Sequence, residues 1–347
     1  MTTSPASPHM PIPDWESMPK VELHLHLEGA IPPEAMWELI LRHGGDPAVP
    51  SPQALAERFE FTDFAHFIST WEWKLKFHDS LDDYRFLAAE VARDLRRQGH
   101  VYVEAFVSPT DSPLDTAELL VAVRQGIDTV DGIEIALIPD LVRDTGPDMA
   151  MRTLESMIDV RHDAGIIGIT IGGSEQHHPP ELFASVYRRA REAGLRLTAH
   201  AGEAAGPESV RRAIRDLGVE RIGHGVRAVE DPALLRELVE SQIPLEVCPT
   251  SNVRTRVAPS MEDHQARTLI DEGVFVTLNT DDPAMFATTL AAEFAAVQAI
   301  GYDDDTMRML AENAIDASWA TPARKRDLHV QLASWFCQEQ PPLASPA

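Results

Sequence analysis

Apolar and polar residues alternate along residues 20–29, whose sequence is Lys-Val-Glu-Leu-His-Leu-His-Leu-Glu-Gly. The apolar side chains fall on one face, and Glu22, His24, His26 and Glu28 fall on the other. A period of two is that of a β-strand. The pattern predicts a strand that projects two imidazoles from one side, and neutral imidazole is a good ligand for Zn²⁺ and similar ions. Two histidines in a strand are often ordinary sheet residues, so the metal hypothesis depends on further ligands.

Seven further short apolar segments follow, and helical patterns lie between them. The predicted strands are residues 101–107, 133–138, 166–171, 195–199, 221–223, 244–247 and 274–278. The predicted helices are residues 33–43, 62–77, 81–98, 116–130, 149–163, 180–193, 207–217, 232–240 and 263–271, with two more at 290–299 and 304–318. Several helices begin at Pro or an acidic residue and end at Gly, which is how helix ends are commonly marked.

This alternation predicts an α/β fold. Nearly continuous apolar strands joined by helices indicate a parallel sheet covered on both sides. Eight such strands favour a closed (β/α)₈ barrel of the TIM type over an open doubly wound sheet, with extra helices after the first strand and at the C-terminus. No repeat or linker divides the chain, so we predict a single domain over residues 14–339, with disordered segments at 1–13 and 340–347.

Composition excludes several classes of function. The 347 residues carry a net charge of −25, which repels nucleic acid. The two cysteines, Cys248 and Cys337, form no C-x-x-C pair, which disfavours a disulfide framework or a thiolate zinc site and suits a reducing cytoplasm. No apolar run is long enough to span a bilayer, and the N-terminus lacks the layout of a signal peptide. We therefore expect a cytoplasmic protein without a membrane partner, and the oligomeric state stays open.

Titratable residues gather where several predicted strands end. The fourth strand ends in Thr-Ile-Gly-Gly-Ser-Glu (170–175), the fifth in Thr-Ala-His-Ala-Gly-Glu (198–203), the sixth in Ile-Gly-His-Gly (222–225) and the eighth in Leu-Asn-Thr-Asp-Asp-Pro (278–283). In a (β/α)₈ barrel these ends meet at the face that carries the chemistry. Buried His and Asp are costly unless they are paired or bind a metal, so the pattern predicts one site at the barrel mouth.

The residue types at this mouth suggest a hydrolytic metal site. His24, His26, His200 and one carboxylate of Asp281 or Asp282 would hold a single Zn²⁺ with a position left for water. A second metal would need a bridging ligand, often a Lys at the end of the fourth strand, where this chain has Thr170. His224 would orient or deprotonate the water, and Glu203 would carry a proton to a leaving group. An acid shortly before the helix at Pro207 could instead serve only that helix N-terminus.

Five segments of the chain together resemble those of a known protein family. Residues 21–29, 198–203, 221–225, 248–252 and 279–283 resemble, in order, the signature segments of the adenosine/adenine deaminase family within the amidohydrolase superfamily. The resemblance implies a zinc-dependent (β/α)₈ barrel that hydrolyses the 6-amino group of a purine to a carbonyl and releases ammonia. It implies one Zn²⁺ per chain, with His24, His26, His200 and Asp281 as the ligands.

The resemblance also implies catalytic roles. Glu203 would protonate N1 of the purine, His224 would stabilise or activate the attacking hydroxide, and Asp281 would share its proton. The substrate-binding residues that it implies are His26, Glu28, Gly173 and Asp282, with Asp282 bonding N7 and the Gly173 N–H bonding N3.

Two departures concern the sugar side of the substrate. Adenosine-specific members usually have Asp where this chain has Glu28, and an Ala-Gly-Asp-Glu turn where it has Gly-Gly-Ser-Glu (172–175). Members that act on adenine, or on modified nucleosides such as aminodeoxyfutalosine, also carry Glu there. However, the aromatic segment 61–77 follows the first strand, where nucleoside-binding members cover the ribose. Its Trp71 and Trp73 would either cover the cavity or pack in the core. We expect adenosine or 2′-deoxyadenosine as substrate, with adenine or aminodeoxyfutalosine as alternatives.

Two other classes remain for comparison. A cyclic-amide or phosphoester hydrolase is disfavoured by the missing Lys in the fourth strand and by the Asp281-Asp282 pair. A non-catalytic purine-binding relative would be expected to have lost at least one of the metal-binding or catalytic residues, and all of them are present.

Overall fold

Eight parallel strands form the centre of the molecule, as the alternation of apolar segments predicts. The computed structural model describes residues 13–62 and 64–339, and the disorder predicted for residues 1–13 and 340–347 falls almost wholly outside these ranges. The strands are β1 (Lys20–His26), β2 (His100–Val107), β3 (Glu134–Pro139), β4 (Gly168–Ile169), β5 (Arg196–Ala201), β6 (Arg221–His224), β7 (Leu245–Val247) and β8 (Val276–Leu278). Every predicted strand is present, although β4 is much shorter than residues 166–171.

The eight strands pair in two sets: β1, β2 and β3 pair in that order, and so do β4, β5, β6, β7 and β8. Contacts at the two seams between these sets close the barrel. Parallel bridges from Leu137 to Ile166 and from Asp140 to Thr170 join β3 to β4. At the other seam, the N–H of His26 donates to the carbonyl of Asp281 (2.8 Å), and the N–H of Asp281 donates to the carbonyl of His24 (3.0 Å). The closure of the barrel therefore itself brings the first strand and the residues after the eighth together.

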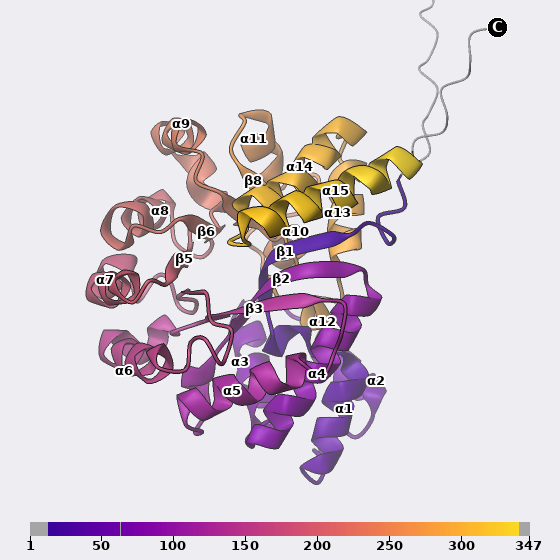
Figure 1. Cartoon of the computed structure of the whole chain (residues 1–347), viewed down its shortest axis with the longest axis vertical. Helices are drawn as coiled ribbons and strands as arrows, with labels where there is room; N and C mark the ends of the chain where they lie inside the picture. The colour runs from indigo at the N-terminus through magenta and orange to yellow at the C-terminus, as the bar shows by residue number, and fades with distance from the viewer. Residues whose placement is uncertain (1–12, 63, 340–347) are drawn as a thin grey trace, which may run out of the picture.

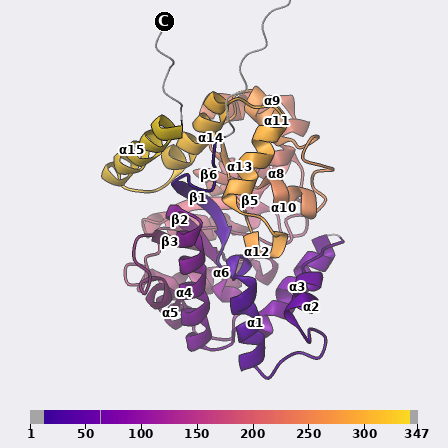
Figure 2. The same ribbon diagram turned by 90° about the vertical axis from the view of Figure 1, so that its right-hand side faces the viewer.

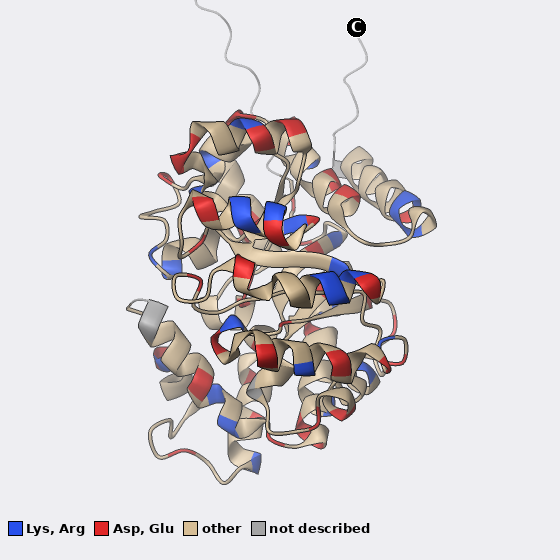
Figure 3. Ribbon diagram, turned by 90° about the vertical axis from the view of Figure 1, so that its left-hand side faces the viewer, with Lys and Arg blue, Asp and Glu red and all other residues tan. Residues whose placement is uncertain are grey.

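Helices surround this barrel (Figure 1). They are α1 (Pro33–Arg42), α2 (Pro52–Arg58), α3 (Phe64–Lys74), α4 (Leu81–Arg97), α5 (Thr116–Ile127), α6 (Gly146–Ile158), α7 (Ala184–Glu192), α8 (Pro207–Arg212), α9 (Pro232–Ser241), α10 (Pro249–Arg254), α11 (Ala266–Asp271), α12 (Pro283–Phe286), α13 (Leu290–Ala299), α14 (Asp304–Ala317) and α15 (Pro322–Glu339). Figure 2 shows α1, α2 and α3 grouped on one side of the molecule, with α15 at the opposite end. In Figure 3 acidic and basic residues are mixed along the helices of the face shown.

The helices that the sequence pattern missed are α2, α10, α12 and α15. Three of them have only four to seven residues, too short for a helical period to stand out. α15 is longer and packs its apolar side against the N-terminal segment, where Trp15 contacts the rings of Trp335 and Phe336. Within residues 13–62 and 64–339, none of the helices combines the length and apolar character that a bilayer-spanning segment needs.

Candidate active site

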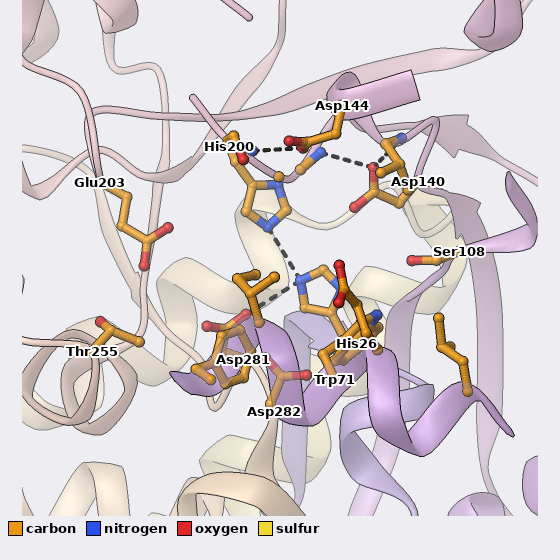
Figure 4. Close-up of a pocket in the computed structure, with 18 of the residues that line it drawn as sticks. His26, Trp71, Ser108, Asp140, Asp144, His200, Glu203, Thr255, Asp281 and Asp282 are labelled. Atoms are coloured by element: carbon orange, nitrogen blue, oxygen red, sulfur yellow. Dashed lines mark hydrogen bonds and ion pairs between the residues drawn. The ribbon is translucent and has the colours of Figure 1, made fainter. Parts of the chain in front are cut away.

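Four side chains from three separate strands converge at the mouth of the barrel. His24 and His26 lie on β1, His200 lies on β5, and Asp281 follows β8. The Nε2 atoms of His24 and His26 lie 3.2 Å and 3.3 Å from Asp281 Oδ1. His26 Nε2 lies 3.2 Å from His200 Nε2. Figure 4 shows His26, His200 and Asp281 facing one another at the back of the cavity.

These spacings fit a tetrahedral metal site. Zn²⁺ binds imidazole nitrogen at about 2.0–2.1 Å, and a tetrahedron of that size separates its ligand atoms by about 3.4 Å. His24 Nε2 is buried and makes no hydrogen bond with the described residues, although it lies among the ligand atoms of the other three groups. His26 Nε2 lies within 3.3 Å of both the His200 nitrogen and the Asp281 oxygen, and this close set is well explained as ligands of one cation. The structure thus brings together the four ligands that the sequence suggested.

A buried carboxylate that the sequence analysis missed orients the first ligand. His24 Nδ1 lies 3.0 Å from Glu246 Oε2 on β7, and both side chains are fully buried. Arg221 pairs with Glu246 and with Glu104, both at 2.6 Å. A carboxylate on the far nitrogen of a metal-binding imidazole fixes its tautomer and raises its basicity. Glu246 lies two residues before the segment 248–252, and its alternating position on a strand was the only signal available.

We expect Glu246→Gln to weaken zinc binding by about 10-fold or more, because such hydrogen-bond partners typically contribute about 10–100-fold in metal affinity. Titration of the metal-free protein with zinc against a competing chelator measures the change. Glu104→Gln is the matched control, because it removes the other carboxylate of Arg221 without touching His24. Equal losses of zinc affinity in the two variants would show that Glu246 acts through the fold and not through His24.

Glu203 and His224 face each other beside the ligands. Glu203 Oε2 lies 3.5 Å from His224 Nε2. Burial, together with the charges of Asp281 and Glu175, raises the pKa of Glu203 to about 8. Burial lowers the pKa of His224 to about 3. The pair therefore combines a carboxylic acid that holds its proton near neutral pH with an imidazole that stays neutral and whose free ring nitrogen can accept a hydrogen bond.

The backbone at the ends of the strands is constrained. His224 and Asp281 have φ values of 61° and 66°, in the left-handed region that non-glycine residues rarely adopt. Such conformations persist where surrounding contacts hold them, and they concentrate at functional sites. Here Ser251 Oγ donates to Asp281 Oδ2 (2.6 Å), and Asn252 Nδ2 lies 3.3 Å from His224 Nδ1. Both partners come from α10, which the sequence pattern did not predict as a helix.

The turn that carries Glu203 is held by a second acid. The Glu175 carboxylate accepts hydrogen bonds from the backbone N–H groups of Gly202 (2.6 Å), Glu203 (3.2 Å) and Ala205 (2.8 Å). Glu175 is 3% exposed. In the sequence, Glu175 stands out only as part of a strand end. Its role is to fix the backbone from which Glu203 projects.

Asp282 and Gly173 also line the cavity. Asp282 is buried, and its Oδ1 has no hydrogen-bond partner among the described residues. It lies so close to Gly29 that a Cβ there would overlap it. Burial and the neighbouring Asp281 raise the pKa of Asp282 to about 7, so its protonated form is available as a donor. The N–H of Gly173, at φ 99°, makes no hydrogen bond within the described part of the chain and borders the cavity.

A cavity of about 290 Å³ lies at this site. The site residues that line it are His26, Gly173, His200, Glu203, His224, Asp281 and Asp282. Its walls also include polar residues that follow β2, β3 and β4, and apolar residues of α3 such as Phe67, Ile68 and Trp71. The two tryptophans of this segment differ in position. Trp71 borders the cavity, whereas Trp73 is 6% exposed, contacts Phe77 and donates to Asp46 (2.7 Å). The cavity cover that the sequence suggested is therefore Trp71, and Trp73 belongs to the core.

Glu28 lies behind the wall of the cavity, which corrects the expected alternation. β1 ends at His26, Leu27 adopts a helical backbone, and Glu28 begins a short 3₁₀ helix (Glu28–Ala30). Its Oε1 accepts from the N–H of Ser108 (2.9 Å), and its carbonyl accepts from Lys74 Nζ (2.6 Å). The strand period ends two residues earlier than the sequence pattern indicates, so Glu28 does not project beside His26.

The chain resembles known deaminases over most of its length. The adenosine deaminase family model matches residues 19–335. The chain is 37% identical to an aminodeoxyfutalosine deaminase of Streptomyces avermitilis over 92% of each chain. It is 38% identical to an adenine deaminase of Bordetella parapertussis over 88% of this chain and 99% of the relative. A zinc-bound amidohydrolase from Burkholderia ambifaria superposes with a TM-score of 0.87 at 28% identity, covering 96% of this chain and 95% of that one.

Proposed function

The chain belongs to the adenosine deaminase family and is a hydrolase that deaminates an adenine-like substrate, and from this premise we propose its reaction in detail. The reaction is the zinc-dependent hydrolysis of the 6-amino group of a purine nucleoside. Adenosine and 2′-deoxyadenosine would yield inosine and 2′-deoxyinosine plus ammonia. The observation that carries the proposal is geometric: Glu203 and His224 lie beside the proposed metal ligands His24, His26, His200 and Asp281 (the metal cradle), at the cavity that Glu203 and His224 line.

We propose one Zn²⁺ per chain, held by His24, His26, His200 and Asp281. A three-histidine, one-carboxylate set at tetrahedral spacing suits zinc, and the residues present fit it. When bound, the ion supplies a hydroxide nucleophile near neutral pH.

The protein residues complete the reaction by placing protons. Glu203 donates a proton to N1, which draws electrons from the ring and makes C6 electrophilic. His224, kept neutral by burial, accepts a hydrogen bond or a proton from the attacking water. Asp281 would share that proton before it reaches the departing amino group, and the proton left on the added hydroxyl would return to Glu203 as the carbonyl forms. The purine is oriented by Asp282, whose protonated carboxyl donates to N7, and by the Gly173 N–H, which donates to N3.

The substituent at N9 decides which purine is the substrate, and the named relatives differ on this point. The cavity extends from the metal cradle past Gly173 to polar residues that follow β2 and β3, among them Ser108 and Asp140. If N3 of the purine accepts from the Gly173 N–H, a sugar on N9, which is bonded to the same ring carbon as N3, is directed toward the polar residues beside Gly173, and this supports a nucleoside as substrate. The Glu28 carboxylate accepts a hydrogen bond from the Ser108 N–H and does not line the cavity. The sugar contacts would therefore come from polar residues that do line it, such as Ser108 and Asp140.

We expect kcat/KM for adenosine and 2′-deoxyadenosine to exceed that for adenine by about 10-fold or more. Contacts to the sugar can be used to orient the ring, so a truncated substrate loses rate as well as affinity. The measurement is ammonia release from adenosine, deoxyadenosine, aminodeoxyfutalosine and adenine with zinc-loaded enzyme. If adenine is turned over fastest, the nucleoside assignment is wrong and the deaminase mechanism stands.

A further inference from the structure

One wall of the cavity is acidic and is formed by Asp140 and Asp144. Asp140 directly follows β3, and Asp144 lies in the 3₁₀ helix Arg143–Thr145 that comes next. Hydroxyl-bearing residues lie beside them: Ser108, Thr145 and Ser174. Among the described residues that line the cavity there is no Lys or Arg. Figure 4 shows Asp140, Asp144 and Ser108 on the side of the cavity opposite Glu203 and Thr255.

Backbone amides hold both carboxylates in place. Asp140 Oδ1 accepts from the N–H groups of Gly172 (2.7 Å) and Val142 (2.9 Å). Asp144 Oδ2 accepts from the N–H of Ser174 (2.7 Å). No hydrogen bond from the residues that the structure describes reaches the second oxygen of either carboxylate. Each acid therefore keeps an acceptor oxygen available for a bound molecule.

The Gly172-Gly173 sequence is what allows this wall. A Cβ on Gly172 would lie 2.5 Å from Asp140 Oδ2, and a Cβ on Gly173 would overlap the Asp144 carboxylate. Side chains at these two positions would push the carboxylates away. The two glycines thus permit close approach of the acids to the strand end that carries the proposed N3 donor.

The two neighbouring cations, Arg143 and Lys74, donate to backbone carbonyls and do not line the cavity. Arg143 lies between the two acids in sequence, but its guanidinium is fully buried and donates to the carbonyls of His200 (2.6 Å) and His178 (2.8 Å). Lys74 is also buried, and its Nζ donates to the Glu28 carbonyl and lies over the ring of Trp71. Neither side chain lines the cavity, so no basic group is placed to pair with an anion there.

The acidic wall lies where the N9 substituent must go, provided that the purine binds as proposed above. N3 and N9 are both bonded to C4 of a purine. When N3 accepts from the Gly173 N–H, the group on N9 is directed at the neighbours of Gly173. Those neighbours are Asp144, which bonds Ser174, and Asp140, which bonds Gly172.

We infer that Asp140 and Asp144 select a substrate whose N9 substituent carries hydroxyl groups and no negative charge. Their free oxygens accept hydrogen bonds from sugar hydroxyls, and their charges repel a phosphate or carboxylate on that substituent. A binding site discriminates effectively against a wrong substrate when a charged group of that substrate meets a like charge of the protein and finds no partner of opposite charge. The substrate class is thus the unphosphorylated 6-aminopurine nucleoside, and purine nucleotides are excluded.

The test compares three N9 groups on the same ring: adenosine, adenosine 5′-monophosphate and 5′-amino-5′-deoxyadenosine. For the zinc-loaded wild-type enzyme we expect kcat/KM for the monophosphate to lie at least about 100-fold below that for adenosine, since like charges a few ångströms apart repel strongly at a partly buried site. The cationic amino analogue should lie within about 10-fold of adenosine, because its charge is opposite to that of the wall. High salt should reduce the discrimination against the monophosphate.

Asp144→Asn is the decisive variant, because Asp144 is exposed and the change keeps its shape. We expect it to reduce the discrimination against the monophosphate by about 10-fold, with Asp140→Asn acting in the same direction. Asp148→Asn is the matched control, since Asp148 lies exposed at the start of α6, outside the cavity lining, and the variant changes net charge equally. Equal effects of Asp144→Asn and Asp148→Asn would overturn the inference.

The outcomes separate this inference from the proposed function. Turnover of the monophosphate at a rate comparable to adenosine would overturn the acidic-wall inference and leave the nucleoside-type deaminase in place. Turnover of free adenine alone would overturn the proposed substrate. Equilibrium binding of adenosine and its 5′-monophosphate to the Glu203→Gln variant, by calorimetry, tests the wall without catalysis. Preference for the monophosphate in that experiment would also overturn the inference.

Discussion

Glu203→Gln is expected to lose about 10²–10⁴-fold in kcat while keeping its zinc, the range that one positioned acid–base group contributes. The amide keeps the shape of the side chain and its place beside His224, but it has no proton that it can transfer to N1. The loss should fall on kcat and on kcat/KM equally, because the proton transfer matters in the transition state. The absorbance change of adenosine on deamination gives the rate, and metal analysis gives the zinc content.

Glu208→Gln is a suitable control for this prediction. Glu208 is an exposed acid five residues further along, at the start of α8, outside the active-site cavity. It should retain full activity and full zinc. If Glu203→Gln instead lost its zinc and kept normal turnover per bound zinc, Glu203 would have a structural role and the proposed proton transfer would be wrong.

His200→Ala is expected to lose both metal and activity. The wild-type protein should hold about one zinc per chain, as a four-ligand site requires. Removal of one imidazole leaves three protein ligands and opens the side of the site that faces His26. Metal analysis after dialysis, together with the deaminase assay with and without added zinc, measures the result.

His177→Ala provides the comparison. His177 is exposed in the loop after β4 and belongs to neither the ligand set nor the cavity lining. This variant should keep its zinc and its rate. A fully active His200→Ala enzyme would remove the proposed zinc site from the mechanism.

The sequence by itself determined the eight strands, most of the longer helices and the metal cradle. Eight apolar segments separated by helical patterns, with Pro and Gly at the helix ends, were enough to predict the barrel that the structure shows. The four proposed ligands could be located because a barrel brings its strand ends to one face, whatever their separation along the chain. His24 and His200 are far apart in sequence, yet each needed only its position at a strand end to be placed. Local periodicity and a fold rule together were sufficient here.

The tertiary structure alone decided which residues surround that cradle. Glu246 and Glu175 looked like ordinary acids in the sequence, and only folding shows that one bonds His24 and the other holds the Glu203 turn. Trp71 and Trp73 have the same local pattern, but they end on different sides of α3.

Glu28 and Asp144 show the physical reason for this division. Glu28 appeared to continue the polar face of a strand, but the chain turns after His26 and the Ser108 N–H binds its carboxylate. Asp144 gave no signal in the sequence, because its position against Ser174 depends on a loop from one strand meeting the end of the next. Alternation and helix caps are properties of neighbouring residues, so the sequence displays them directly. A hydrogen bond between distant segments depends on where each backbone turns, and only the packed structure determines that.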